Sequence, residues 1–292
     1  MDGGKGNPFK GISLILTTFN WPDALEVTLH SILNQSRSPD EILVADDGSE
    51  AMTAHAVKRV LGPSTIRWAH VRHGDQGIRQ ARIKNLAVRY ARGSYLLFID
   101  HDVMLHPRFV DDHVHNREKD TFLQGKRSFL PEGFTKRLLM DKKYQAPSPF
   151  LQGLGNRKNT IRNPLLKQIL SRRKGFQTSI RGCNLSMHRD DFLRVDGYDE
   201  TFDLLWGRED SDICFRLFHS GVKVKNLWFC ALQYHLFHEV IKKKGKDRLD
   251  EELEKNLGEG RKKALKGFSM LSSEGGIVAS SPGFETERGM VS

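Results

Sequence analysis

The chain lacks a hydrophobic run long enough to span a lipid bilayer, which needs roughly 20 consecutive apolar residues. Its longest apolar runs, such as Tyr95-Leu-Leu-Phe-Ile99, have the length of a β-strand. The first six residues, Met-Asp-Gly-Gly-Lys-Gly, have no apolar core of a secretory signal, so we expect no signal peptide. The sequence therefore predicts a protein without a helical membrane span.

Cysteine is also scarce in this sequence. Cys183, Cys214 and Cys230 are the three cysteines of 292 residues, and each lies in an apolar pattern rather than at a metal-ligand spacing. This excludes a disulfide scaffold and a zinc finger. Such cysteine usage suits a reducing compartment, and we expect the protein in the cytoplasm, with a peripheral position at the inner face of the membrane as a second expectation.

The chain does have the composition of a globular protein with a sizeable core, with 38% hydrophobic and 28% charged residues. Its net charge of +10 lies in one segment, because residues 118–175 contain 14 Lys or Arg and 4 Asp or Glu while the remainder is balanced. Charge alone leaves two interpretations open. The segment is a solvated basic loop, or it is a surface for an anionic partner such as a phosphorylated glycolipid, a membrane leaflet or nucleic acid.

Short apolar runs alternate with helical patterns in the first third of the chain. The runs predict strands at 12–17, 41–45, 66–71 and 95–99, and the patterns between them predict helices from Pro22, at 51–61 and at 78–90. This alternation predicts an α/β fold with a mostly parallel sheet and helices on both faces. Ligands bind such sheets at the carboxyl ends of the strands.

The rest of the chain is less regular. We expect residues 120–178 to be irregular, and strands at 178–187 and 222–229, the second followed by Tyr234-His-Leu-Phe-His238. Helices are expected at 189–195, 212–220 and 242–266, and the Ser-, Gly- and Pro-containing end is expected to be disordered.

Two carboxylates, Asp100 and Asp102, follow the predicted strand 95–99. Carboxylates at this spacing can be presented from a strand end to a hard divalent cation, and His235 and His238 could complete its coordination. The alternative for the acids is a strand-end turn with solvated side chains. For the two histidines, the alternative is a purely structural role.

Polar residues also follow a second strand, as Asp46-Asp47-Gly-Ser49. An acid there could accept a hydrogen bond from a base or ribose, or the segment could be an ordinary Asp-Gly turn with a Ser cap. Arg79, Arg82 and Lys84 could neutralise a diphosphate or be solvated.

A further cluster, Trp206-Gly-Arg-Glu-Asp210, precedes the predicted helix 212–220. An indole can stack on a pyranose ring while one carboxylate deprotonates a hydroxyl nucleophile. Acids at a helix N-terminus are also simple partners of the helix dipole, so both interpretations stay open.

The order of these segments resembles that of the family 2 glycosyltransferases of the GT-A (nucleotide-diphospho-sugar transferase) fold. The resemblance covers residues 11–240, and its second half looks like a galactosyltransferase-type C-terminal module. The matching segments are Leu16-Thr-Thr-Phe-Asn20, Ala45-Asp-Asp-Gly-Ser49, Gly77-Ile-Arg-Gln-Ala-Arg-Ile-Lys-Asn85, Asp100-His-Asp102, Gly182-Cys-Asn184, Gly197-Tyr-Asp-Glu200 and Trp206-Gly-Arg-Glu-Asp210.

This resemblance implies an inverting, metal-dependent transfer of a hexose or N-acetylhexosamine from a nucleotide sugar, usually UDP-linked, to a hydroxyl of a glycan or glycolipid. The expected setting is bacterial surface polysaccharide or lipopolysaccharide synthesis. The acceptor is expected to be phosphorylated or membrane-embedded, with contact to an anionic membrane and none to nucleic acid. The cation, Mn²⁺ or Mg²⁺, stabilises negative charge on the departing UDP.

The resemblance also implies roles for particular residues. The implied donor-binding residues are Thr17, Asn20, Asp46 and Asp47 at the nucleoside, Arg79, Lys84 and Asn85 at the base or diphosphate, Asp100 at the ribose or sugar, and Trp206 at the sugars. The implied metal ligands are Asp102 and His238, with His235 as a further candidate. Glu209 would hold the acceptor, and Asp210 would be the general base. The family more often has Arg where Lys84 stands, so a bidentate phosphate grip is not expected there.

The expected organisation is a flexible N-terminus (1–10), a GT-A domain (11–240), a charged helix (241–267) and a disordered tail (268–292). The domain would divide into a nucleotide-binding half (11–117), a basic loop region (118–177) and an acceptor and catalytic half (178–240).

Two other functions are compatible with such a sheet. A sugar nucleotidyltransferase should carry a Gly-rich basic loop after its first strand, and Thr17-Thr-Phe-Asn-Trp21 is not such a loop. A non-catalytic protein that binds anionic polymers would be expected to have lost some of Asp102, Asp210 and His238, which are all present.

Overall fold

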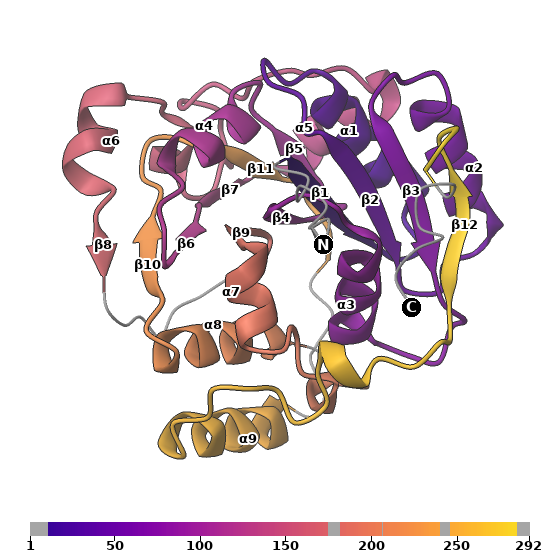
Figure 1. The fold of residues 1–292 in the computed structure, drawn as a ribbon. Coiled ribbons are helices and arrows are strands. Elements are labelled where there is room, and N and C mark those ends of the chain that lie inside the picture. Colours follow the sequence, from indigo (N-terminus) through magenta and orange to yellow (C-terminus); the bar gives the residue numbers. More distant parts are fainter. Residues whose placement is uncertain (1–10, 175–181, 206, 240–245, 285–292) are drawn as a thin grey trace, which may run out of the picture.

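The structure, a computed structural model, describes residues 11–174, 182–205, 207–239 and 246–284. Within these residues a nine-stranded sheet has the strand order β12-β3-β2-β1-β4-β9-β6-β10-β8 (Figure 1). The strands that run in one direction are β1 (Ile12–Thr18), β2 (Glu41–Asp46), β3 (Arg67–Arg72), β4 (Tyr95–Asp100), β6 (Thr121–Gln124) and β10 (Lys223–Asn226). The strands that run the other way are β8 (Arg173–Lys174), β9 (Asn184–His188) and β12 (Gly276–Ser280). The mostly parallel sheet is therefore confirmed.

Both faces of the sheet are covered because its central strands are apolar on both sides. Every residue of β1 and β2 is buried, and alternate side chains enter opposite layers of the core. Leu14 and Leu16 pack with one layer, for example, while Ile15 between them packs with the other.

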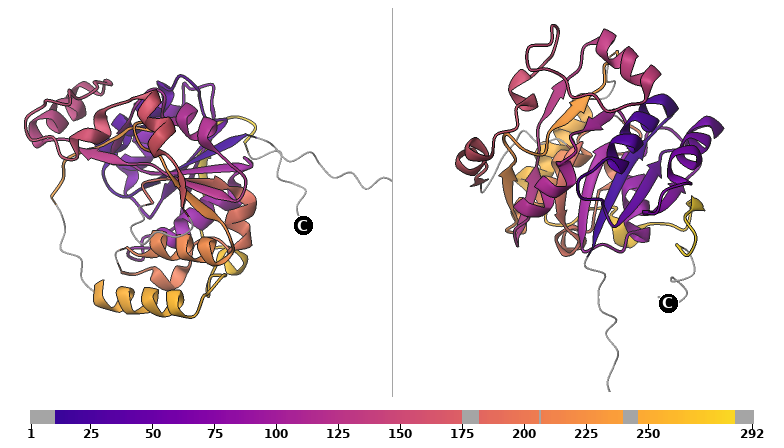
Figure 2. Two further views of the ribbon diagram at one scale, coloured as in Figure 1. Left: turned by 90° about the vertical axis from the view of Figure 1, so that its left-hand side faces the viewer. Right: turned by 90° about the horizontal axis from the view of Figure 1, so that it is seen from above.

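Helices from different parts of the chain form the two layers (Figure 1). One layer contains α1 (Pro22–Leu33), α2 (Ala51–Leu61) and α4 (Phe109–Asn116). The other contains α3 (Gln80–Tyr90), α7 (Arg189–Arg194) and α8 (Glu209–His219). Helix α9 (Lys246–Gly258) packs outside α8 as a further layer (Figure 2). The predicted helix 51–61 is confirmed to the residue, and α8 begins three residues before its predicted start.

A smaller sheet continues the fold beyond β4. It has the order β5-β11-β7, with β5 at Val103–Leu105, β11 at Gln233–His235 and β7 at Arg127–Phe129. Helix α5 (Glu132–Asp141) covers this sheet through Phe134 and Leu138. The 3₁₀ turn η1 (Arg157–Thr160) lies against this sheet, and α6 (Pro164–Leu170) follows η1 in the chain.

Three parts of the expected organisation differ from the structure. The expected charged helix 241–267 is shorter among the described residues, because α9 ends at Gly258 and Gly260 follows with a left-handed backbone (φ of 64°). The described residues of the basic segment are not all loop, because β6 is buried inside the main sheet between β9 and β10. The tail 268–292 is not disordered throughout, because it forms η3 (Phe268–Met270) and then β12, which pairs antiparallel with β3. Strand β12 was missed because its stability comes from the open edge of β3 rather than from a strong local pattern.

All three cysteines are buried and free. Within the described residues, no helix is long and apolar enough to cross a bilayer. The 3₁₀ turn η2 (Glu200–Phe202) completes the elements and lies against α3.

One buried histidine ties α4 to the sheet. His113 Nε2 lies 2.8 Å from Asn184 Oδ1, and its Nδ1 lies 2.8 Å from Ser186 Oγ. Burial lowers the pKa of His113 to about 4, although Asn184 and Asp112 oppose this shift. The neutral ring is therefore the form that the fold holds.

This histidine predicts a pH dependence of stability. Between pH 6.5 and 4 the unfolded chain binds a proton that the folded chain does not, so stability falls as the pH falls. From pH 7 to pH 5 the loss is about 2 kcal/mol. Urea unfolding should show that His113→Gln removes this part of the pH dependence. His115→Gln, at a side chain that is 62% exposed, should retain it, and equal slopes for wild type and His113→Gln would contradict the prediction.

Candidate active site

The carboxyl ends of β1, β2 and β4 bring the predicted donor-binding residues to one edge of the sheet. Thr17 is in register with Asp100, and Thr18 with Asp46. Burial, and then the neighbouring Asp102 charge, raise the pKa of Asp100 to about 7, against the opposing effect of Lys84. Asp100, at the end of β4, thus lies near enough to Asp102 and to Lys84 for both charges to act on it.

Asp46 lies beneath the surface of this edge rather than on it. It is 1% exposed, its Oδ2 lies 2.7 Å from His70 Nε2, and its Oδ1 accepts the Ser49 N–H at 2.8 Å. Burial would raise the pKa of Asp46, but the hydrogen bonds from His70 and Ser49 outweigh it and lower the pKa. Asp46 therefore shapes the turn after β2, and the prediction that it lines a nucleoside pocket does not match its burial.

Asp47 and Asn20 organise the loops above that turn. Asp47 accepts the Arg79 backbone N–H at 3.0 Å, which joins the end of β2 to the start of α3. Asn20 has a left-handed backbone with φ of 45°, and its Oδ1 accepts the Glu50 N–H at 2.8 Å. The first contact thus joins the loop after β2 to the start of α3, and the second joins the loop after β1 to the loop after β2. Both contacts lie at the predicted nucleoside site.

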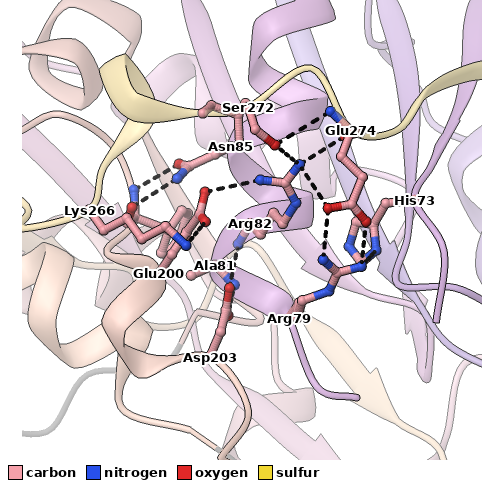
Figure 3. Close-up of polar contacts among 12 residues, drawn as sticks. His73, Arg79, Ala81, Arg82, Asn85, Glu200, Asp203, Lys266, Ser272 and Glu274 are labelled. Carbon is pink, nitrogen blue, oxygen red and sulfur yellow. Dashed lines mark hydrogen bonds and ion pairs between the residues drawn. The ribbon is translucent and has the colours of Figure 1, made fainter. Parts of the chain in front are cut away.

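The C-terminal segment reaches the same region and engages two arginines of α3 and its N-terminal flank (Figure 3). Glu274 pairs with Arg79 at 3.1 Å and lies 3.6 Å from Arg82. Arg82 also donates to the Ser272 hydroxyl at 2.9 Å. The hydrogen bond from Arg79 lowers the pKa of Glu274. Arg79, expected at the base or diphosphate, is thus held by a carboxylate of the C-terminal segment that no sequence motif indicated.

Asn85 has a structural role in the described residues. It is fully buried, its Nδ2 donates to the Tyr198 carbonyl at 2.8 Å, and its Oδ1 accepts the Tyr198 N–H at 2.9 Å (Figure 3). These two bonds hold α3 to the chain at Tyr198, and the contact of Asn85 with a base or diphosphate stays a prediction. Gly197 allows the approach, because a Cβ there would lie 2.6 Å from Asn85 Oδ1.

Lys84 lies with the predicted catalytic acids rather than facing a diphosphate. Its Nζ is 3.0 Å from Glu209 Oε1 and 3.0 Å from Asp210 Oδ1. Both acids are in the first turn of α8, where the helix dipole favours ionised carboxylates. Asp210 also accepts the Gly182 N–H at 3.0 Å, and a Cβ at Gly182 would collide with it. We call Lys84, Glu209 and Asp210 the acid–lysine cluster.

The charges of this cluster depend on one another. Burial alone would lower the pKa of Lys84, but Asp210 and Glu209 outweigh it and hold the pKa well above its usual value. Burial and the Asp210 charge raise the pKa of Glu209 against the effect of Lys84. Because Glu209 is 4% exposed and the Asp210 side chain is 24% exposed, Asp210 is the acid that an incoming group can reach.

Asp102, His235 and His238 form a second cluster, as the sequence predicts. Pairing of β5 with β11 sets His235 opposite Val103, which brings Asp102 beside it. Asp102 Oδ2 lies 3.1 Å from His235 Nε2 and 3.3 Å from His238 Nε2. One potential ligand atom from each residue lies within 4.8 Å of the others. We call these three residues the metal-ligand cluster.

The surroundings of this cluster fit a cation. His235 Nδ1 donates to the Leu236 carbonyl and His238 Nδ1 to the Glu239 carbonyl, so each Nε2 is directed at Asp102. Asp102 Oδ1 is buried and has no hydrogen-bond partner among the described residues. Burial opposes ionisation of Asp102, but the two histidines hold its pKa well below its usual range. A carboxylate and two oriented imidazoles form a suitable donor set for a divalent cation.

Several residues of the site were not found from the sequence. Tyr198 lies under the Lys84 ammonium, 4.8 Å from Nζ to ring centroid, and Arg127 carries a positive charge that acts on Asp100. Trp21 contacts the His238 ring edge-on at 5.8 Å. Tyr198 belongs to the matching segment Gly197-Tyr-Asp-Glu200, but that segment gave it no role, and tertiary packing alone places Arg127 and Trp21 at the site. Trp206, predicted at the sugars, lies outside the described residues.

The contacts of the tail predict a stability effect. Removal of residues 268–292 would take away β12 and the buried Phe284, and would leave the nearly buried guanidiniums of Arg79 and Arg82 without Glu274. We expect the free energy of unfolding to fall by at least about 3 kcal/mol. A chain that ends at Phe284 keeps these contacts and is the matched control. Equal urea midpoints for the two truncated chains would contradict the prediction.

Two solved structures share the fold of this chain. A mannosyltransferase from Pyrobaculum calidifontis, solved in complex with GDP-Man and Mn²⁺, aligns with a TM-score of 0.57 at 16% identity over 82% of this chain and 61% of that one. Staphylococcus aureus TarS 1–349 in complex with UDP-GlcNAc aligns with a TM-score of 0.51 at 16% identity, covering 79% of this chain and 60% of that one. The fold is that of the GT-A glycosyltransferases.

The sequence comparison gives the family. Residues 13–192 match glycosyl transferase family 2, and residues 169–239 match a family described as the N-terminal domain of galactosyltransferase. The chain therefore belongs to glycosyl transferase family 2.

The curated relatives are longer proteins. Chondroitin synthase of Escherichia coli is 26% identical over 77% of this chain and 34% of its own length. Hyaluronan synthase of Pasteurella multocida is 30% identical over 41% of this chain and 12% of its own length. Validoxylamine A glucosyltransferase of Streptomyces hygroscopicus subsp. limoneus is 26% identical over 78% of this chain and 53% of its own length. The chain thus spans between about a tenth and about half of these relatives.

Proposed function

We propose that the protein transfers a hexose or N-acetylhexosamine from a nucleotide sugar to a glycan or glycolipid hydroxyl, with inversion at the anomeric carbon. The observation that carries this proposal is the meeting of two clusters at Asp100. The Asp100 carboxyl feels the charge of Asp102, which belongs to the metal-ligand cluster. It also feels the charges of Lys84 and Asp210, which belong to the acid–lysine cluster. A donor diphosphate and an acceptor hydroxyl can therefore be held at the same edge of the sheet.

In this reaction Asp210 accepts the proton of the acceptor hydroxyl as its oxygen bonds to the anomeric carbon. The bond from that carbon to the diphosphate oxygen breaks at the same time, on the opposite face of the sugar. Lys84, 3.0 Å from Asp210, and the Gly182 N–H orient the carboxylate. The nearly buried Glu209 positions Lys84, and its predicted contact with the acceptor is a part of this proposal.

Asp102, His235 and His238 would hold the divalent cation, which when bound supplies positive charge to stabilise the departing nucleoside diphosphate. Two imidazoles in the donor set favour Mn²⁺ over Mg²⁺, because Mg²⁺ prefers an all-oxygen shell. Thr17 at the end of β1, with Asn20 and Asp47 in the loops beyond β1 and β2, would receive the nucleoside, and UDP is the proposed carrier.

The proposal separates from its alternatives in one assay. The chain is incubated with a panel of radiolabelled nucleotide sugars and Mn²⁺, and hydrolysis and transfer are scored. We expect turnover with one or a few UDP-sugars. A sugar nucleotidyltransferase would instead release pyrophosphate from a nucleoside triphosphate and a sugar phosphate. A protein that only binds anionic polymers would give no turnover with any donor.

The proposal includes peripheral contact with an anionic membrane, and α6 supports it. Within this seven-residue helix no residue is buried, and the exposed fractions are 73% for Leu165, 54% for Ile169 and 47% for Leu170. It belongs to the segment 118–175 that holds the charge excess, with Lys167 on the helix and Arg172 just after it. Exposed aliphatic side chains with basic neighbours suit the interface of an anionic bilayer.

Vesicle co-sedimentation tests this contact. We expect binding to phosphatidylglycerol vesicles that weakens with salt and with neutral phosphatidylcholine. Leu165→Ser with Ile169→Ser should lower the partition constant by about tenfold or more, because two aliphatic side chains no longer leave water. Met270→Ser, at an exposed methionine on η3, is the control. Equal binding by both variants would contradict a role for α6.

A further inference from the structure

A pocket of about 140 Å³ lies beside the candidate active site, on the far side of β9 from β4. Its walls come from the turn between β6 and β7, from η1 and from the segment after β10. The lining includes Lys126, Arg127, Lys158 and Trp228. Gly125 belongs to the floor, where a Cβ would collide with Asn184 at 2.2 Å. We call this the basic pocket.

The charge in the basic pocket is of one sign. Its lining contains two lysines and one arginine, and among the described residues it contains no Asp or Glu. The Lys126 and Lys158 ammonium groups lie 4.8 Å and 5.1 Å from the centre of the Trp228 ring. The indole holds both ammonium groups near one point, and Lys126 also donates to Asn226 Oδ1 at 2.8 Å. Amide groups such as Asn159 supply neutral hydrogen-bonding partners.

Arg127 connects the basic pocket to the active site. Its guanidinium lies over the Phe129 ring at 5.0 Å and donates to Cys183 Sγ at 3.4 Å. Its charge also acts on Asp100 and on His238. Arg127 Nε is buried and has no hydrogen-bond partner among the described residues. A ligand group bound in the basic pocket would therefore lie next to the carboxyl end of β4. It would lie on the opposite side of β4 from the loops after β1 and β2, where the nucleoside is expected.

We propose that the basic pocket binds the anionic group of the acceptor, a carboxylate or a phosphate on the sugar that receives the new linkage or on its neighbour. This rests on the proposed transfer to a glycan hydroxyl. The pocket has room for one charged group and part of a sugar ring, and three cations in one partly dehydrated site favour an anion over a neutral hydroxyl. Binding there would anchor the acceptor while its hydroxyl lies near Asp210.

Ligand-observed NMR with the full chain tests the proposal by using D-glucuronate, glucose 6-phosphate and neutral D-glucose as probes. We expect one or both anions to bind and glucose not to bind, and the two anions distinguish a carboxylate from a phosphate. The double change Lys126→Gln with Lys158→Gln should weaken anion binding by about tenfold or more, the usual effect of losing hydrogen bonds to charged groups. The single change Lys158→Gln should also weaken anion binding. It should alter the fold little, because the Lys158 side chain is exposed.

Lys143→Gln removes the same charge from an exposed lysine of the basic segment outside the pocket and is the matched control. It should bind the anions as the unaltered chain does. Equal losses in Lys143→Gln and Lys158→Gln, unchanged anion binding in the double variant, or equal binding of glucose would each overturn the proposal. Hydrolysis of nucleotide sugars by the unaltered chain is measured separately. Selective anion binding without any hydrolysis would thus reject the proposed transferase, whereas hydrolysis without anion binding would reject the basic pocket.

Discussion

Asp210→Asn should lower the turnover number by roughly 10²–10⁴, the usual effect of removing a general base. The asparagine keeps an oxygen for the Gly182 N–H, which Asp210 accepts at 3.0 Å, but it cannot take a proton from the acceptor hydroxyl. Donor binding should therefore persist. Steady-state transfer to a glycan acceptor gives the turnover number, and calorimetry with UDP gives the donor affinity.

Two further variants make this result specific. Asp120→Asn makes the same chemical change at a surface ion pair with Arg194 and should leave turnover unchanged. Glu209→Gln should lower turnover less than Asp210→Asn does, because Glu209 is nearly buried and acts through Lys84. If Asp210→Asn turned over at a near-normal rate, Glu209 or another group would have to accept the proton.

Asp102→Ala should abolish the effect of Mn²⁺ on UDP binding together with nearly all transfer activity. For the unaltered chain we expect UDP to bind more tightly when Mn²⁺ is present, since a bridging diphosphate would add ligands to the three that the protein offers. Loss of a residue that merely orients a metal ligand costs about 10–100-fold in metal affinity, and loss of a ligand should cost more.

Calorimetric titration of UDP with and without Mn²⁺ measures this dependence. His235→Gln and His238→Gln should each weaken the Mn²⁺ effect, since both Nε2 atoms are directed at Asp102. The control is His115→Gln, which changes an exposed histidine of α4. Equal UDP affinity with and without Mn²⁺ in the unaltered chain would reject the metal-ligand cluster as a cation site.

The sequence by itself determined the sheet and its binding edge. Mostly apolar runs such as 12–17 and 41–45 can be buried on both faces only between two helical layers, and this follows from composition and period without tertiary information. Polar residues that directly follow such runs must gather at one edge when the strands are parallel. Asp46 and Asp100, which directly follow predicted strands, lie at this edge, and Thr17, whose role only the resemblance implied, is in register with Asp100.

Tertiary structure alone decided which polar residues share a contact. Lys84 and Asp210 are separated by 126 positions, and whether Lys84 faces a ligand or α8 depends on how α3 packs against the second half of the chain. Asn85, its neighbour, is buried for the same reason. The tail shows the effect most plainly, because Gly276–Ser280 has little strand signal of its own and becomes β12 by hydrogen bonding to the free edge of β3. Short-range patterns specify which elements form, whereas contacts between distant segments depend on packing that no local pattern encodes.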